Sequence, residues 1–157
     1  MVESGILWGK VGDMFTGEYQ HNLDTKGRII IPSKFRDELN TSFILTKGYD
    51  GCLSIYSLLQ WQKIKEQIDL LPTSKMAVRK YIRTLMSITS ECSLDNQGRI
   101  QIPSYLAKPA NLTKECVVVG VNDHIEIWDK KAWEEYFDDA SSSFEEIAEN
   151  LSELGNV

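Results

Sequence analysis

Short stretches rich in apolar, β-branched and aromatic residues recur along the chain, each bounded by Gly, Asp, Asn or Pro. In the first part these are FTGEYQHNL, RIIIP, FILTKG and CLSIYS. Such stretches between turn residues predict β-strands of about five residues. DTKG joins the first two, and its Gly27 is free to take a positive φ; Tyr49–Gly51 joins the last two. The pattern therefore predicts two hairpins.

Other stretches place their hydrophobic residues at helical spacing, as Met76, Tyr81 and Leu85 do. Pro32 ends a strand, and SKFRDELN after it fits one or two helical turns. Ser143 and Glu146 have the spacing of a capping box, which predicts a last helix with apolar residues on one side. The longer helices are predicted at Leu59–Leu70, Ser74–Ser87, Lys131–Phe137 and from Ser143 onward.

The strand pattern occurs twice. LDTKGRIIIPS at Leu23–Ser33 returns 71 residues later as LDNQGRIQIPS at Leu94–Ser104. Beyond a slip near Asn40–Phe43 the offset becomes 72, so that Gly48 matches Gly120. The second copy has its own hairpin, VVVGV and HIEIW across the pair Asn-Asp. A period this long, seen twice, indicates a duplicated unit rather than a solenoid.

Each unit is too small to stand alone, because about 50 residues with four short strands bury too little core. We therefore expect an α+β fold in which the two units pair about a pseudo-twofold axis and close one β-barrel with flanking helices. The predicted divisions are a leader at 1–13, unit 1 at 14–60, connecting helices at 61–90, unit 2 at 91–137 and an acidic C-terminal helix at 138–157.

The net charge of −6 conceals a split between the two halves. Residues 1–90 carry 12 Lys and Arg against 9 Asp and Glu, whereas residues 91–157 carry 5 against 14. The basic half is a candidate for binding nucleic acid, and the acidic end for solubility or assembly. Charge alone also fits ordinary solvated faces, so the composition leaves this open.

Several functional classes lack their sequence signals. No apolar run approaches the roughly 20 residues of a membrane helix. Cys52, Cys92 and Cys116 are odd in number and widely spaced, which fits buried thiols in a reducing cytosol rather than disulfides or a metal site. His21 and His124 are accompanied by no nucleophile, metal-protease or phosphate-loop motif. We expect no catalytic residues, metal, cofactor, small-molecule substrate or membrane contact.

The residues that both copies keep are those of the turn: Asp24, Gly27, Asp95 and Gly98. We interpret these four as structural. Both copies also keep an arginine, Arg28 or Arg99. Each arginine either pairs with its own aspartate across the turn or is exposed to contact phosphates or bases.

The two copies differ in charge around this turn. Where the first has Lys26, Lys34 and Arg36, the second has Gln97, Tyr105 and Ala107. With Arg28, the first hairpin and the turn after it carry four cations, which can neutralise phosphates, while an arginine can reach guanine O6 and N7. The alternative is an ordinary solvated surface, which is also how we interpret the cations of the middle helices.

Three segments carry a resemblance to a known family: MFTGEYQHNLDTKGRIIIPSKFRDEL, DNQGRIQIP and KECVVVGVNDHIEIWDKKAWEEY. From Met14 onward the chain resembles the MraZ family of bacterial transcription factors, built from two AbrB-like swapped-hairpin units of the SpoVT/AbrB superfamily. The resemblance implies sequence-specific binding of double-stranded DNA at repeated boxes in the promoter of the division and cell-wall gene cluster, its own gene included. It also implies ring-shaped homo-oligomers in the cytoplasm, at the nucleoid.

The family's DNA-contacting motif maps onto Lys26, Arg28 and Arg99. Lys34 and Arg36 are added as DNA-binding candidates from the comparison of the two copies. The alternative function is an antitoxin-like or scaffolding protein, since swapped-hairpin units also serve as antitoxins. Those are usually single units with a disordered tail, whereas this chain has two units and a helically patterned end.

Residues 1–13, MVESGILWGKVGD, have no counterpart in the repeat or in the resemblance, and we expect them to be disordered or absent in the working protein. Trp8-Gly9 is necessarily encoded with TGGG, and Ser4-Gly5 and Val11-Gly12 can be, at steps of about ten bases, one turn of B-DNA. The hypothesis is a translated operator that the protein itself binds. Chance is the alternative, since Gly, Val and Ser are common.

Overall fold

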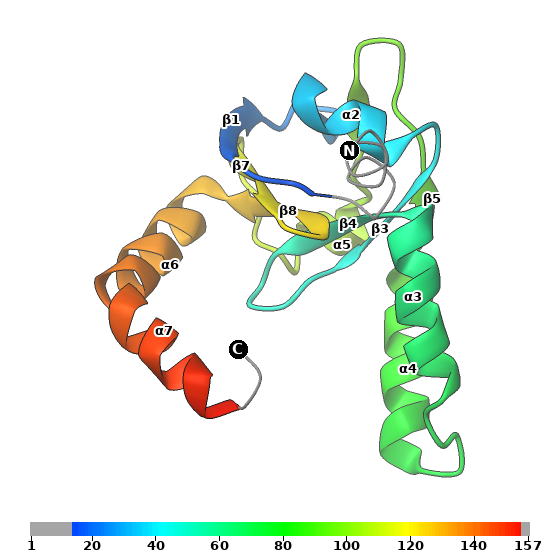
Figure 1. The fold of residues 1–157 in the computed structure, drawn as a ribbon. Coiled ribbons are helices and arrows are strands. Elements are labelled where there is room, and N and C mark those ends of the chain that lie inside the picture. Colours follow the sequence, from blue (N-terminus) through cyan, green and yellow to red (C-terminus); the bar gives the residue numbers. More distant parts are fainter. Residues whose placement is uncertain (1–13, 155–157) are drawn as a thin grey trace, which may run out of the picture.

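The computed structural model describes residues 14–154, so the predicted leader and the last three residues lie outside the described part. The first copy folds as two strands, a short helix, a hairpin and a pair of helices (Figure 1). Its elements are β1 (Glu18–Asn22), β2 (Arg28–Ile30), α2 (Ser33–Leu39), β3 (Phe43–Lys47), β4 (Leu53–Ser57), α3 (Leu58–Asp69) and α4 (Met76–Ile88).

The second copy repeats this order as far as its first long helix. Its elements are β5 (Ser90–Cys92), β6 (Arg99–Gln101), α5 (Ser104–Ala107), β7 (Glu115–Val121), β8 (His124–Asp129), α6 (Lys130–Ser142), α7 (Phe144–Leu151) and a final 3-10 turn (Ser152–Leu154). The predicted strands and helices are thus all present, with α6 longer than its pattern indicated. None of the described helices is both long and apolar enough to cross a bilayer.

The first long helix of each copy begins directly after a strand, at a polar capping residue. The Ser57 hydroxyl accepts a hydrogen bond from the Gln60 amide at the start of α3, and the Asp129 carboxylate accepts one from Ala132 at the start of α6. The capping box predicted at Ser143 is wrong, because its side chain makes no capping bond to α7. The Ser143 amide instead ends α6, bonding the carbonyls of Ala140 and Ser141.

The large sheet interlocks the two copies. Its strand order is β1-β7-β8-β4-β3-β5, so the first strand of each copy pairs with the hairpin of the other. The order reads the same from both ends, as a pseudo-twofold axis requires. At the centre β4 pairs with β8, with Ser54 opposite Glu126. This exchange of strands explains why neither unit could complete its own core.

A second, two-stranded sheet joins the repeated phrases themselves. β2 and β6 run antiparallel with Ile29 opposite Ile100, and both side chains are buried. Two further bonds extend the pairing symmetrically: the Ile31 amide donates to the Gly98 carbonyl (2.9 Å), and the Ile102 amide to the Gly27 carbonyl (2.7 Å). The main hydrophobic core lies between this ribbon, with α2 and α5, and the inner face of the large sheet.

The predicted closed barrel is not confirmed. β1 and β5 are the two edges of the six-stranded sheet, and no ladder joins them within residues 14–154. The physical reason lies in β2 and β6, which pair with each other instead of bridging those edges. The fold is therefore α+β with two interlocked units, an open antiparallel sheet and a separate ribbon.

The strand register corrects one detail of the repeat. His21 lies opposite Cys116, and Cys92, the residue equivalent to His21, lies opposite Phe43. Cys116 therefore takes the place of Phe43, and the β3–β4 turn is one residue longer than the β7–β8 turn. It follows that Gly120 is equivalent to Lys47 rather than to Gly48.

Candidate nucleic-acid interface

The first turn is organised by one carboxylate. Asp24 Oδ1 accepts hydrogen bonds from the amides of Lys26 (2.9 Å) and Arg28 (2.8 Å), and Oδ2 accepts one from Arg28 Nε (2.7 Å). The Gly27 amide closes the turn on the Asp24 carbonyl, with Gly27 at a φ of 78°. Glycine is required there because other L-residues are strained at positive φ.

The second turn repeats this geometry. Asp95 accepts bonds from the amides of Gln97 and Arg99 (both 2.9 Å) and from Arg99 Nε (2.8 Å), with Gly98 at a φ of 75°. Asp24, Gly27, Asp95 and Gly98, which we interpreted as structural, thus form the two turns. Each arginine does pair with its own aspartate.

This pairing uses one edge of each guanidinium group and leaves the rest available. Only Nε is bonded in Arg28, and its two terminal nitrogens make no hydrogen bond within the described residues. Arg99 is similar, with one terminal nitrogen 3.9 Å from Asp24 Oδ2. The aspartate therefore fixes the direction of the arginine without consuming its two-pronged end, which is the part that binds phosphates and guanine.

Both aspartates are held in the charged form. The backbone amide of Arg28 lowers the pKa of Asp24 most, helped by the Arg28 side chain and the Lys26 amide, although partial desolvation opposes them. The backbone amide of Arg99 does the same for the pKa of Asp95. Hydrogen bonds to a carboxylate favour its ionised form. The two Asp–Arg pairs thus persist at neutral pH.

The ribbon presents an outward face with both arginines on it. Since side chains alternate along a strand, burial of Ile29 and Ile100 turns Arg28, Ile30, Arg99 and Gln101 outward. Arg28 lies opposite Gln101, and Arg99 opposite Ile30. The two arginines are therefore diagonal to each other across the pseudo-axis, with Lys26 in the adjoining turn.

Two further residues lie on this face, and they were not identified from the sequence. Ile30 is 38% exposed although it is apolar. The side-chain amide of Gln101 donates to the Lys26 carbonyl and so holds the first turn in place. The signal was available, because Ile30 and Gln101 occupy equivalent positions and are the one difference within the repeated strand. A position that changes inside an otherwise constant phrase indicates exposure.

The four cations do not all surround the first hairpin, which corrects the sequence interpretation. Arg36 Nε donates to the Ile31 carbonyl (2.8 Å), and its guanidinium lies so close to Gly98 that a methyl group there would collide with it. Lys34 Nζ donates to the Thr16 hydroxyl (3.2 Å). Because the copies interlock, the second turn lies beside α2, and the Arg36 guanidinium packs against that turn. Lys34 instead points to the segment before β1.

Arg36 also affects a neighbouring histidine. Burial, and then the positive charge of Arg36, lowers the pKa of His21. A neutral His21 at physiological pH adds no further charge to this surface.

Among residues 14–154, no three His, Cys, Asp or Glu side chains are grouped so as to hold a metal ion.

Two interlocked hairpin units that expose a ribbon with paired arginines define a tandem swapped-hairpin protein with a cationic surface. A family model described as "MraZ protein, putative antitoxin-like" matches residues 14–83 and again residues 85–154. The chain therefore belongs to the MraZ family, a regulatory rather than an enzymatic one.

Proposed function

We propose that this protein is a transcription factor that binds double-stranded DNA through the outward face of the β2–β6 ribbon. The observation that carries the proposal is the Asp-held arginine pair, Arg28 and Arg99, whose terminal nitrogens are directed by a fixed carboxylate. A two-stranded ribbon fits the major groove, and an arginine fork there discriminates guanine. Lys26 in the adjoining turn supplies a phosphate contact.

Lys34 and Arg36 extend the positive surface on either side of the ribbon. Their assigned role is sequence-independent attraction to phosphates, since one reaches toward Thr16 and the other lies against the second turn. Charge of this kind positions a protein on the duplex but does not read its sequence.

The proposed target is a set of repeated boxes in the promoter of the division and cell-wall gene cluster, beginning with the protein's own gene. Family membership supports a regulatory role of this type. One small ribbon offers few contacts, so useful affinity needs several subunits on one DNA, through multivalency. We accordingly propose a ring-shaped homo-oligomer that works in the cytoplasm at the nucleoid.

The test is fluorescence anisotropy of the full chain on a duplex from its own upstream region, against a shuffled duplex of the same composition. The wild type should prefer its own duplex, and Arg28→Ala should remove that preference. Lys65→Ala is the control, because it deletes a cation that pairs with Asp69 on α3. Equal affinity of the wild type for both duplexes would overturn the proposal.

A second candidate is an antitoxin-like protein, which the family description favours by its wording. In that case the same units would bind a partner protein. The neighbouring genes distinguish the two: a toxin gene beside this one supports the antitoxin, and a cell-wall cluster supports the regulator.

A further inference from the structure

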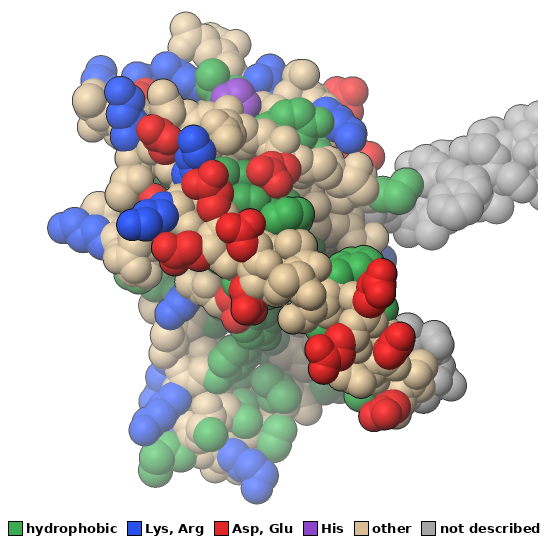
Figure 2. Space-filling model, turned by 90° about the vertical axis from the view of Figure 1, so that its left-hand side faces the viewer, with side chains coloured by type: hydrophobic (Ala, Val, Ile, Leu, Met, Phe, Trp, Pro, Cys, Tyr) green, Lys and Arg blue, Asp and Glu red, His purple; other side chains and the backbone are tan. Residues whose placement is uncertain are grey.

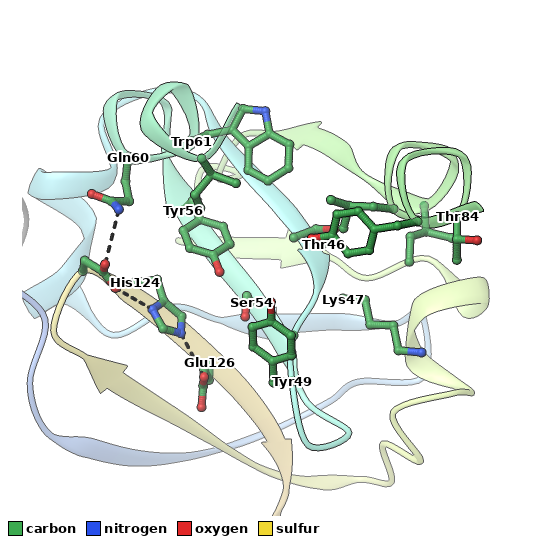
Figure 3. A pocket seen from close by; sticks show the side chains of 16 residues that line it. Thr46, Lys47, Tyr49, Ser54, Tyr56, Gln60, Trp61, Thr84, His124 and Glu126 are labelled. Atoms are coloured by element: carbon green, nitrogen blue, oxygen red, sulfur yellow. Dashed lines mark hydrogen bonds and ion pairs between the residues drawn. The ribbon is translucent and has the colours of Figure 1, made fainter. Parts of the chain in front are cut away.

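The outer face of the sheet carries a groove that the DNA-binding proposal does not use. It lies between the α3–α4 hairpin and strands β3, β4 and β8, and holds about 560 Å³. Figure 3 shows its aromatic lining, which includes Tyr49, Tyr56, Trp61 and His124. Tyr81 and Leu85 of α4 complete the wall. We refer to this feature as the arm groove.

The polar groups at the bottom of the arm groove are already satisfied. His124 donates or accepts on both ring nitrogens, with Asp123 (2.8 Å) and Glu126 (2.9 Å), and its ring stacks on Tyr56. Glu126 also accepts a hydrogen bond from the Trp128 indole, and the side-chain amide of Gln60 donates to the Asp123 carboxylate. The rest of the groove is mainly apolar surface that faces solvent, which favours an apolar occupant over a polar ligand.

The chain also carries an unpartnered apolar helix face. On α7 and the turn after it, one side presents Phe144 (70% exposed), Ile147, Leu151 and Leu154 (75% exposed) to solvent. Figure 1 shows α7 standing clear of the sheet, on the side away from the α3–α4 hairpin. α3 has α4 folded back beside it, whereas α6, its counterpart, is followed by a helix that does not fold back.

The charges of the two features are complementary. Residues 132–154 contain eight Asp and Glu and no Lys or Arg, and Figure 2 shows acidic side chains spread over the side that carries α6 and α7. Residues 58–88, the α3–α4 hairpin, contain six Lys and Arg against two acidic residues. Such a pairing guides association and fixes its orientation.

We propose that the arm groove of one subunit receives the apolar face of α7 from a second copy of this chain. This inference rests on the proposed self-assembly and names its interface. An amphipathic helix in an apolar groove is a common recognition mode. Most of the residues that line the groove come from the first half of the chain, and α7 lies at its end, so the contact joins two different surfaces. Such a head-to-tail contact can be repeated until a ring closes.

The experiment uses two variants that each destroy one side of the contact. Leu151→Glu places a charge on the α7 face, and Tyr81→Glu places one in the arm groove; both residues are exposed, so the fold should survive, as circular dichroism checks. Asn150→Glu and Met86→Glu add the same charge to the same helices away from the contact. Light scattering at micromolar concentration should show roughly tenfold or more weaker self-association for the first pair only.

Mixing then tests the head-to-tail geometry. The Leu151→Glu subunit keeps an intact groove and the Tyr81→Glu subunit an intact α7, so an equimolar mixture should form a heterodimer that neither forms alone. A mixture that remains monomeric would overturn the inference, as would a wild-type chain that is monomeric at this concentration. If both variants keep the wild-type mass, this interface is wrong while ring assembly stands, and DNA binding is judged separately through Arg28→Ala.

Discussion

The two turns of this protein are built alike, bond for bond, yet different groups lie over them. Over the first turn lies the neutral amide of Gln101, from the second copy. Over the second lies the guanidinium of Arg36, from the first copy. Because the copies interlock, each turn is completed by the other copy. The cations of the first copy therefore lie at both turns, since Arg36 lies over the second. The positive charge that distinguishes the first copy in the sequence is thus a property of the whole ribbon and not of one hairpin.

The largest expected effect comes from removing the arginines one at a time. Arg28→Ala should weaken specific DNA binding by roughly 1–3 kcal/mol per subunit, because an arginine fork discriminates its base by that amount. Arg99→Ala should cost less, since one of its terminal nitrogens already faces Asp24. Competition against a shuffled duplex measures both. Arg79→Ala, whose guanidinium bonds the carbonyls of Thr73 and Ser74, is the matched control.

If Arg99→Ala loses more specificity than Arg28→Ala, the second turn is the principal reader. If neither loses any, the Asp–Arg pairs serve only the fold.

Next in size is the effect of alanine at the two turn glycines. Gly27→Ala and Gly98→Ala both force a side chain into positive φ, which costs about 1–3 kcal/mol of unfolding free energy. Gly27→Ala should be the more damaging, because its methyl would meet the fixed Ile102 carbonyl at 3.1 Å, whereas at Gly98 it meets the flexible end of Arg36. Denaturant unfolding measures the difference, and a larger loss at Gly98 would show that Arg36 is rigidly held.

A smaller effect concerns cations that attract phosphates. Lys34→Ala should weaken binding to all duplexes about equally and lower the slope of log affinity against log salt by about one. The converse change, Tyr105→Lys, should raise that slope by about one, since Tyr105 is the exposed equivalent of Lys34. Titrations at several salt concentrations test both changes. A Lys34→Ala effect confined to one sequence would make Lys34 a base-reading residue.

The smallest expected effect is a pH dependence of stability at acid pH. The pKa values of Asp24 and Asp95 are lowered in the folded state, so their contribution is present above the unfolded value of about 3.9 and is lost as the pH falls through the folded values. The free energy of unfolding, measured from pH 7 to pH 3, should therefore fall less in the Asp24→Asn, Asp95→Asn double variant than in the wild type. An equal fall in both proteins would mean that the two carboxylates are not coupled to folding.

Much of this architecture follows from the sequence, because a repeated phrase with turn chemistry fixes hairpins locally. The DTKG turn, the strands beside it and the helices after each hairpin were all predicted. The open sheet was not, since strand order depends on which copy each strand pairs with, and no local pattern records that. The exchange of β1 and β5 between copies also hid the equivalence of Cys116 with Phe43.

The sequence indicated the residue types of the candidate site but not their arrangement. Repetition of Asp24 and Arg28 as Asp95 and Arg99 identified the pairs, yet left pairing and exposure as alternatives. In the structure the two are compatible, because Nε makes the bond and the terminal nitrogens stay outside. The place of Arg36 could not be foreseen, since it depends on a contact between residues some 60 positions apart in the chain.

The central claim, that DNA lies on the outward face of the β2–β6 ribbon, is tested most directly by photo-crosslinking. A benzophenone side chain placed at Ile30, beside Arg99 on that face, should crosslink to a duplex from the protein's own upstream region. The same group at Tyr49, which is 80% exposed on the β3–β4 turn, should not. Crosslinks from Tyr49 with none from Ile30 would contradict the account and place the DNA on the opposite side of the molecule.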